Sequence, residues 1–114
     1  MAAFMHRFWK GNTPMNILVN DLAVDGPDDI CLVEVRLHLS AASGVQSFTV
    51  TVGSNDGTEY DAVLSSTAMN GLTDKYLTDW NIIRAKDHIT FALANALALT
   101  WGLEMIYGRA SEIY

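Results

Sequence analysis

The chain has 114 residues, of which half are hydrophobic and 18% are charged, and its 7 Lys+Arg against 13 Asp+Glu give a formal net charge of −6. This length and composition predict one globular domain with a single core and exclude a disordered chain. A negative surface repels the phosphate backbone of nucleic acid, so nucleic acid is not an expected partner.

The first 14 residues differ from the rest of the chain. Residues 1–14 contain Arg7 and Lys10 but no acid, which leaves 5 basic and 13 acidic groups in the remainder. In a short helix ended by Gly11 and Pro14, the apolar side chains of this segment would share one face. We therefore predict an N-terminal arm that either folds back on the core or anchors the chain to a neighbouring subunit. The predicted interface residues of the arm are Phe4, Met5, Arg7, Phe8, Trp9 and Lys10.

Beyond the arm, apolar and polar residues alternate as half-buried β-strands require. The alternation is strictest at residues 33–40 and 48–52, and a small-residue turn around Gly44 separates these two runs. Asp56 and Gly57 form the strongest short-range hairpin signal and precede a further run. Consecutive strands of this kind predict a meander or part of a Greek key. Other predicted strands cover residues 15–20, 60–65 and 80–83.

The segment FALANALAL, residues 91–99, is ambiguous, because Ala and Leu are the best helix formers. The alternation from residue 99 to residue 107 includes Trp, Ile and Tyr, which favour strands. We interpret ANAL as a bend between strands at 89–93 and 99–107, with a helix as the alternative. The predicted fold is all-β: an antiparallel β-sandwich or small jelly roll of about seven strands at residues 15–110, with a C-terminal tail at 111–114.

Few residues point to chemistry. The single cysteine, Cys31, excludes an internal disulfide and is expected to act as a small core hydrophobe. The three histidines are far apart in the sequence and have no metal-ligand spacing. Two acidic loops could offer oxygen ligands to calcium, but ordinary turn chemistry explains them better. Their residues are Asp25, Asp28 and Asp29 in one loop, and Asn55, Asp56, Glu59 and Asp61 in the other.

These observations predict a non-enzymatic protein without a cofactor. If the chain were a small β-barrel enzyme instead, its turnover would depend on His38 or Glu104. The most apolar window, residues 89–103, is shorter than the ~20 residues of a membrane span, and no export signal is visible, so no membrane partner is expected.

The C-terminal part, from GTEYDAVLSS through DKYLTDWNIIRAKDHITFALANALALTWGLEMIYG, resembles small virion proteins of tailed bacteriophages. The shared pattern is an E-Y-D strand, a loop with an apolar-polar turn, and a final T-W-G-L strand ending in Tyr-Gly, over roughly residues 30–108. The resemblance implies a β-sandwich subunit of the capsid surface, neck or tail, with no catalytic residues. The arm lies outside it.

Our leading hypothesis is a non-enzymatic structural component of a bacteriophage particle, assembled in the host cytoplasm. Its partners would be other virion proteins and copies of itself, so a homo-oligomer is expected. The alternative is a carbohydrate-binding β-sandwich module, in which an exposed aromatic ring stacks on sugar. Trp80 is the candidate for such stacking, because the alternating pattern places Trp101 in the core.

Overall fold

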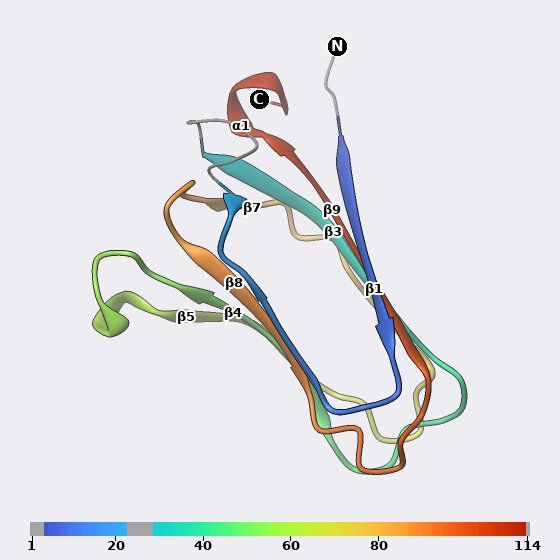
Figure 1. Ribbon diagram of the computed structural model, residues 1–114. Coiled ribbons are helices and arrows are strands. Elements are labelled where there is room, and N and C mark those ends of the chain that lie inside the picture. The colour runs from blue at the N-terminus through green and yellow to red at the C-terminus, as the bar shows by residue number, and fades with distance from the viewer. Residues whose placement is uncertain (1–3, 23–28, 114) are drawn as a thin grey trace.

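The computed structural model describes residues 4–22 and 29–113, which form two antiparallel β-sheets packed face to face (Figure 1). This confirms the predicted all-β sandwich, with nine strands in the described residues where about seven were expected. No helix in this part of the chain is long and apolar enough to cross a membrane. The elements are β1 (Met5–Gly11), β2 (Met15–Val19), β3 (Ile30–Leu39), β4 (Ser47–Gly53), β5 (Ala62–Ala68), β6 (Asp74–Leu77), β7 (Asn81–Ile83), β8 (His88–Leu93), β9 (Trp101–Arg109) and the short α1 (Ala110–Ile113).

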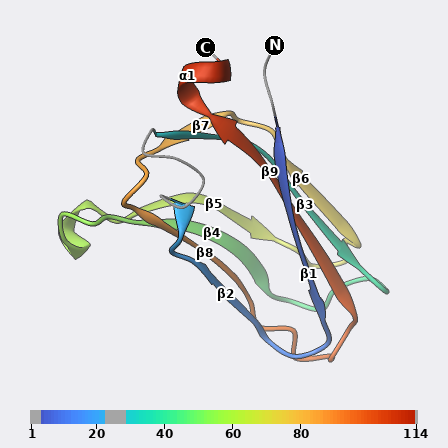
Figure 2. The same ribbon diagram turned by 45° about the horizontal axis from the view of Figure 1, so that its top comes forward.

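The strand order is that of a jelly roll. One sheet has the order β1-β9-β3-β6, with β7 also paired to β3, and the other has the order β2-β8-β4-β5 (Figure 2). The antiparallel pairs β1·β9, β2·β8 and β3·β6 each join an earlier strand to a later one, and the pair β4·β5 lies at the middle of this nested series. The chain is therefore one long antiparallel hairpin wrapped into two layers. We call the layer that contains β1 the first sheet and the layer that contains β2 the second sheet.

The short helix predicted for the N-terminal arm is wrong. The segment Met5–Gly11 is a β-strand that pairs with β9 along its whole length, from Met5 opposite Tyr107 to Gly11 opposite Trp101. Its residues alternate between half-buried and exposed, which is the period of two expected at a sheet. The helical spacing of the aromatics was overridden by pairing with a strand about a hundred residues later in the sequence.

Of the two predicted alternatives, a meander or part of a Greek key, the meander is wrong, and the observed jelly-roll order contains Greek keys. β3 and β4 follow one another in the sequence but lie in different sheets, so they do not pair. β4 does pair with the next strand, β5, and the connection between them contains a 3₁₀ turn at Thr58–Tyr60. The strict alternation located both strands, but alternation does not specify which neighbour a strand bonds to.

The core lies between the two sheets and is built from the inward residues of each alternating strand. Phe48 of β4 and Phe91 of β8 are fully buried and stack with ring centroids 6.5 Å apart. Trp101 is buried, as predicted, and its indole Nε1 donates to the carbonyl oxygen of Thr13 at 2.8 Å. Other buried core residues include Leu37, Leu39, Ile89, Leu93, Leu103 and Met105.

Cys31 is buried, as expected, but outside the main core. It forms a second small cluster with Val33 and Ile106 at one end of the first sheet. The helix α1 contacts β3 and β9, and the backbone N–H of Ala110 donates to the carbonyl oxygen of Asp29 at 2.9 Å. The C-terminal residues therefore fold back on the sheet that carries the cysteine.

The bend predicted at ANAL is confirmed, since β8 ends at Leu93 and β9 begins at Trp101. Asn95 organises this bend. It is buried, has a positive φ of 51°, and its side-chain amide donates to the carbonyl oxygens of Thr13 and Leu99 at 3.2 and 2.9 Å. Its Oδ1 accepts the backbone N–H of Leu99 at 3.0 Å, and its own N–H donates to Gln46 Oε1 at 2.6 Å. The side chain and backbone N–H of this one residue thus tie three connections together at this end of the sandwich.

Candidate functional site

The predicted arm residues divide between the two faces of β1. Trp9 and Met5 pack against the core, with the Trp9 ring 5.9 Å from that of Phe91. Arg7 donates through Nε to the Tyr107 hydroxyl at 2.8 Å. These three side chains are held within the domain, which leaves the outward residues of β1 for contacts with other molecules.

The outward residues of the predicted arm are Phe4, Phe8 and Lys10. Phe8 is 70% exposed, and the ring of His6 lies parallel to it at a centroid distance of 6.2 Å. Their role at an interface stays a prediction. A deletion of residues 1–12 would remove these outward residues, but it would also remove Trp9 from the core. Point substitutions of the outward residues therefore test the interface role more cleanly.

Trp80, the predicted sugar-stacking residue, lies between β6 and β7 with a positive φ of 50° and 45% of its surface exposed. The ring of Phe4 meets it edge to face at a centroid distance of 6.4 Å. The structure therefore brings Trp80 together with the start of the arm, a proximity that their separation in the sequence does not suggest. Sugar stacking on Trp80 stays a prediction.

A hollow of about 630 Å³ lies on the outer face of the first sheet. The strand register places Phe8, Glu104, Arg36 and Tyr76 in one row across β1, β9, β3 and β6. The adjacent row contains Gly102, and a Cβ added there would meet nothing within 4 Å. The missing side chain at this position leaves the floor of the hollow open. The adjacent row as a whole is Lys10, Gly102, His38 and Asp74.

Arg36 pairs with Glu104 across this hollow and with Glu34 beside it, and His38 pairs with Asp74. Arg36 donates to both carboxylate oxygens of Glu34 at 2.9 and 3.0 Å and reaches Glu104 at 3.5 Å. His38 Nδ1 donates to Asp74 Oδ1 at 2.6 Å. The hydrogen bond from Arg36 holds the pKa of Glu34 below its ordinary value, and the hydrogen bond from His38 does the same for the pKa of Asp74.

These two lowered pKa values predict acid sensitivity. A carboxyl whose pKa is lower in the folded state stabilises the fold above its unfolded pKa, and this stabilisation is lost as the pH falls through the folded pKa. We expect the free energy of unfolding, measured by urea denaturation, to decrease below about pH 4.5, the ordinary pKa of Glu34. Glu34→Gln should make this decrease shallower. An equally steep decrease in that variant would contradict the assignment.

The acidic loop between β4 and β5 behaves as turn chemistry predicts. Asp61 Oδ1 accepts the backbone N–H of Ser54 at 2.8 Å, and Asp56 forms an ion pair with Arg84 at 2.8 Å. In the other acidic loop, Asp25 and Asp28 lie outside the described residues. Within the residues that are described, no group of three or more His, Cys, Asp and Glu side chains is placed to hold a metal ion.

The edge of the second sheet at β5 lacks the charges found on β1 and β6. β5 reads AVLSSTA and contains neither a charged residue nor proline. Edge strands of monomeric proteins are usually protected by such residues, and β1 carries Arg7 and Lys10 while β6 carries Asp74 and Lys75. The edge strand β2 and the three-residue strand β7 are also uncharged. Beside β2, however, an ion pair of 2.6 Å joins Arg7 of β1 to Asp21, which follows β2.

The sequence did not reveal the hollow or the β5 edge as sites. The hollow exists only because the register aligns residues of four strands that are distant in the sequence. One signal was available: Gly102 interrupts an otherwise large-residue strand, and a glycine inside a strand often marks a close approach to the backbone. For β5 no such signal was available, because the predicted strand at residues 60–65 includes the charged Asp61, whereas the observed strand begins at Ala62.

No protein-family model matches the sequence. None of the curated proteins matches it either. Among solved structures, the core of Drosophila NLP, described in terms of pentamer formation and histone binding, superposes with a TM-score of 0.54 at 10% identity over 94% of this chain and 97% of that one.

A second solved structure is a mutant of chitosan-binding module 1 from a chitosanase/glucanase of Paenibacillus sp. IK-5. It has a TM-score of 0.51 at 19% identity over 91% of this chain and 76% of that one. The protein of Infectious Bursal Virus T=1 particles reaches a TM-score of only 0.44 at 12% identity, covering 98% of this chain and 32% of that one, which is too low to support an argument. At these identities the first two likenesses show the fold alone.

Proposed function

We propose that the chain is a non-enzymatic structural subunit of a tailed-bacteriophage particle that works through repeated contacts between copies of itself. The sequence resemblance of residues 30–108 to small virion proteins motivates the assignment to a particle. The observation that carries the subunit contact is the uncharged, proline-free edge strand β5. The Drosophila NLP core, whose structure concerns pentamer formation, is an example of a similar fold that assembles.

The partner of β5 in this proposal is β5 of a second copy, paired antiparallel about a two-fold axis at Ser66. A bulge at Leu64 interrupts the pairing with β4, but the stretch from Ser65 to Ala68 is regular. Around the axis, Ser66 would face Ser66 and Ser65 would face Thr67, which are short polar side chains that pair well across strands. Two four-stranded sheets would then become one continuous sheet of eight strands.

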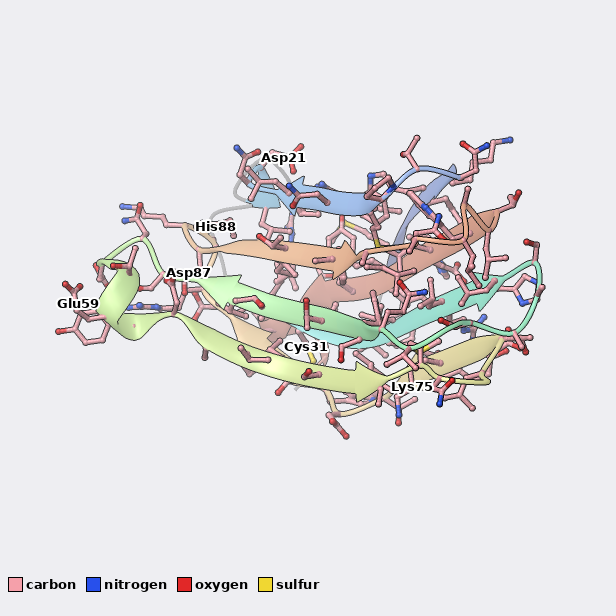
Figure 3. The ribbon with its side chains drawn as sticks, turned by 90° about the horizontal axis from the view of Figure 1, so that it is seen from below. Asp21, Cys31, Glu59, Lys75, Asp87 and His88 are labelled. Carbon is pink, nitrogen blue, oxygen red and sulfur yellow. The ribbon has the colours of Figure 1, made fainter. Side chains whose placement is uncertain are left out.

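Charged residues flank β5 without entering it. Figure 3 shows Glu59 in the loop that precedes β5, and Lys75 lies on β6 in the other sheet. The strand itself carries no charge, so the negative net charge of the chain, which opposes self-association, is not concentrated at the paired residues.

Charge placed on the two-fold axis tests the proposal. Ser66 is exposed, so Ser66→Lys should leave the fold intact but put two like charges opposite each other, and we expect the assembly to dissociate in analytical ultracentrifugation. Ser66→Glu should do the same. Mixing the two variants should restore association, because the charges are then opposite.

The matched control is Val45→Lys, which adds the same charge at an exposed loop residue and should assemble like the unmodified chain. Unchanged assembly of Ser66→Lys, or a mixture that remains dissociated, would contradict a β5 contact.

The alternative function, a carbohydrate-binding module, has its own specific expectation. If Trp80 is the stacking residue, its fluorescence should be quenched by the bound glycan and the quenching should disappear in Trp80→Phe. The similar fold of the chitosan-binding module makes this alternative worth the measurement.

A further inference from the structure

Neither subunit assembly through β5 nor stacking on Trp80 uses the hollow on the outer face of the first sheet. Two exposed aromatic rings stand at its opposite sides. Phe8 on β1 is 70% exposed and Tyr76 on β6 is 58% exposed. They are separated by three inter-strand steps, or about 14 Å at ~4.8 Å per step. A volume of about 630 Å³ lies within the range of pockets that bind small ligands.

Charged side chains lie between the two rings. Glu104 and Arg36 lie between Phe8 and Tyr76 in the same row, and His38 and Asp74 lie in the next row. A protein-docking surface has its apolar groups together at the centre and its charges at the rim. Here the arrangement is reversed, with aromatic rings at the edges and hydrogen-bonding groups in the middle.

The charge balance of the hollow favours an uncharged ligand. The guanidinium of Arg36 is engaged by Glu34 and Glu104, and His38 is engaged by Asp74. The lining carries Lys10 and Arg36 against the carboxylates of Glu104 and Asp74, so neither an anionic nor a cationic ligand meets a net opposite charge. These paired groups still offer donors and acceptors side by side, which suits adjacent hydroxyl groups.

We infer that this hollow, with Phe8 and Tyr76 at its sides and Gly102 at its floor, binds a neutral oligosaccharide of two or three pyranose rings. The apolar faces of the terminal sugar rings stack on the two aromatic rings, and their hydroxyls bond to Arg36, Glu104 and Asp74. The stacked ring of His6, whose Nδ1 donates to Glu104 at 2.9 Å, helps to order the Phe8 platform before binding.

The test uses the complete chain and three neutral trisaccharides as probes: maltotriose, cellotriose and N-acetylchitotriose. Binding is followed by backbone amide chemical-shift changes in NMR spectra. We expect at least one probe to bind and to shift the signals of Phe8, Gly102 and Tyr76. The result that would overturn the inference is that none of the three binds, or that the shifts gather around Trp80 instead.

Two variants separate the hollow from other surfaces. Gly102→Val fills the floor without a steric clash, since a Cβ there meets nothing within 4 Å, and it should leave the spectrum folded while weakening binding at least about tenfold. Tyr76→Ala should weaken binding about tenfold through the lost platform. The matched control is Tyr60→Ala, an exposed tyrosine outside the hollow, which should bind as the unmodified chain does. Equal affinity in Gly102→Val and the unmodified chain would refute the site.

Discussion

Phe91→Ala should lower the free energy of unfolding by about 3–5 kcal/mol, the usual cost of deleting a buried aromatic ring. Phe91 is fully buried on β8, between the ring of Phe48 at 6.5 Å and that of Trp9 at 5.9 Å. Its removal leaves a cavity where the two sheets and the N-terminal strand meet. The change is measurable by guanidinium denaturation, and it is a large share of the ~5–15 kcal/mol that stabilises a domain of this size.

The control for Phe91 is Phe8→Ala, which removes the same side chain from the exposed outer face of β1. We expect Phe8→Ala to lower the free energy of unfolding by at most about 0.5 kcal/mol, the usual range for surface substitutions. If the two variants were equally stable, the inward and outward assignment of these strands would be wrong.

Asn95→Ala should lower the free energy of unfolding by about 2–4 kcal/mol, through two separate effects. Alanine is strained at a φ of 51°, by roughly 1–2 kcal/mol. It also leaves the carbonyl oxygen of Thr13 and the N–H of Leu99 without the buried side chain that now bonds to them. Thermal or chemical denaturation of the variant measures the sum.

Asn95→Gly separates the two effects, because glycine tolerates the positive φ but cannot make the hydrogen bonds. It should be more stable than Asn95→Ala and less stable than the unmodified chain. Ala98, whose φ is 52°, offers a control of opposite sign: Ala98→Gly should be neutral or slightly stabilising. If Ala98→Gly lowered the free energy of unfolding as much as Asn95→Ala, any substitution in this bend would be destabilising.

The sequence predicted those parts of the fold that depend on local pattern. Alternation located β3, β4 and β9, and it correctly assigned Trp101 to the core. It also decided the ambiguous segment at residues 91–99 against a helix, because the strand that follows is strictly alternating. In each of these cases the signal and the structure lie in the same ten residues.

What the sequence could not predict depends on long-range pairing. Phe4, Phe8 and Trp9 fit a helix face as well as they fit a strand, and only β9, far along the chain, decides between them. The separation of β3 from β4 into different sheets likewise follows from the wrapping of the whole hairpin. Pairing between distant segments is a property of the complete fold and leaves little trace in either strand alone.

The candidate sites follow the same division. Individual residues such as Phe8, His38 and Glu104 stood out in the sequence, but separately. Their alignment with Gly102 and Tyr76 into one hollow needs four strands in register. The β5 edge, in turn, becomes visible only when the strand is known to have one bonded neighbour, β4.

Native mass spectrometry of the unmodified chain tests the central claim, self-assembly through the β5 edge, most directly. The spectrum would be recorded over a concentration series up to roughly 100 µM, at which a contact with a dissociation constant of about 1 µM is nearly saturated. We expect a defined oligomer with an even number of subunits, because the β5 contact is two-fold. A chain that stays monomeric across the whole series would contradict it.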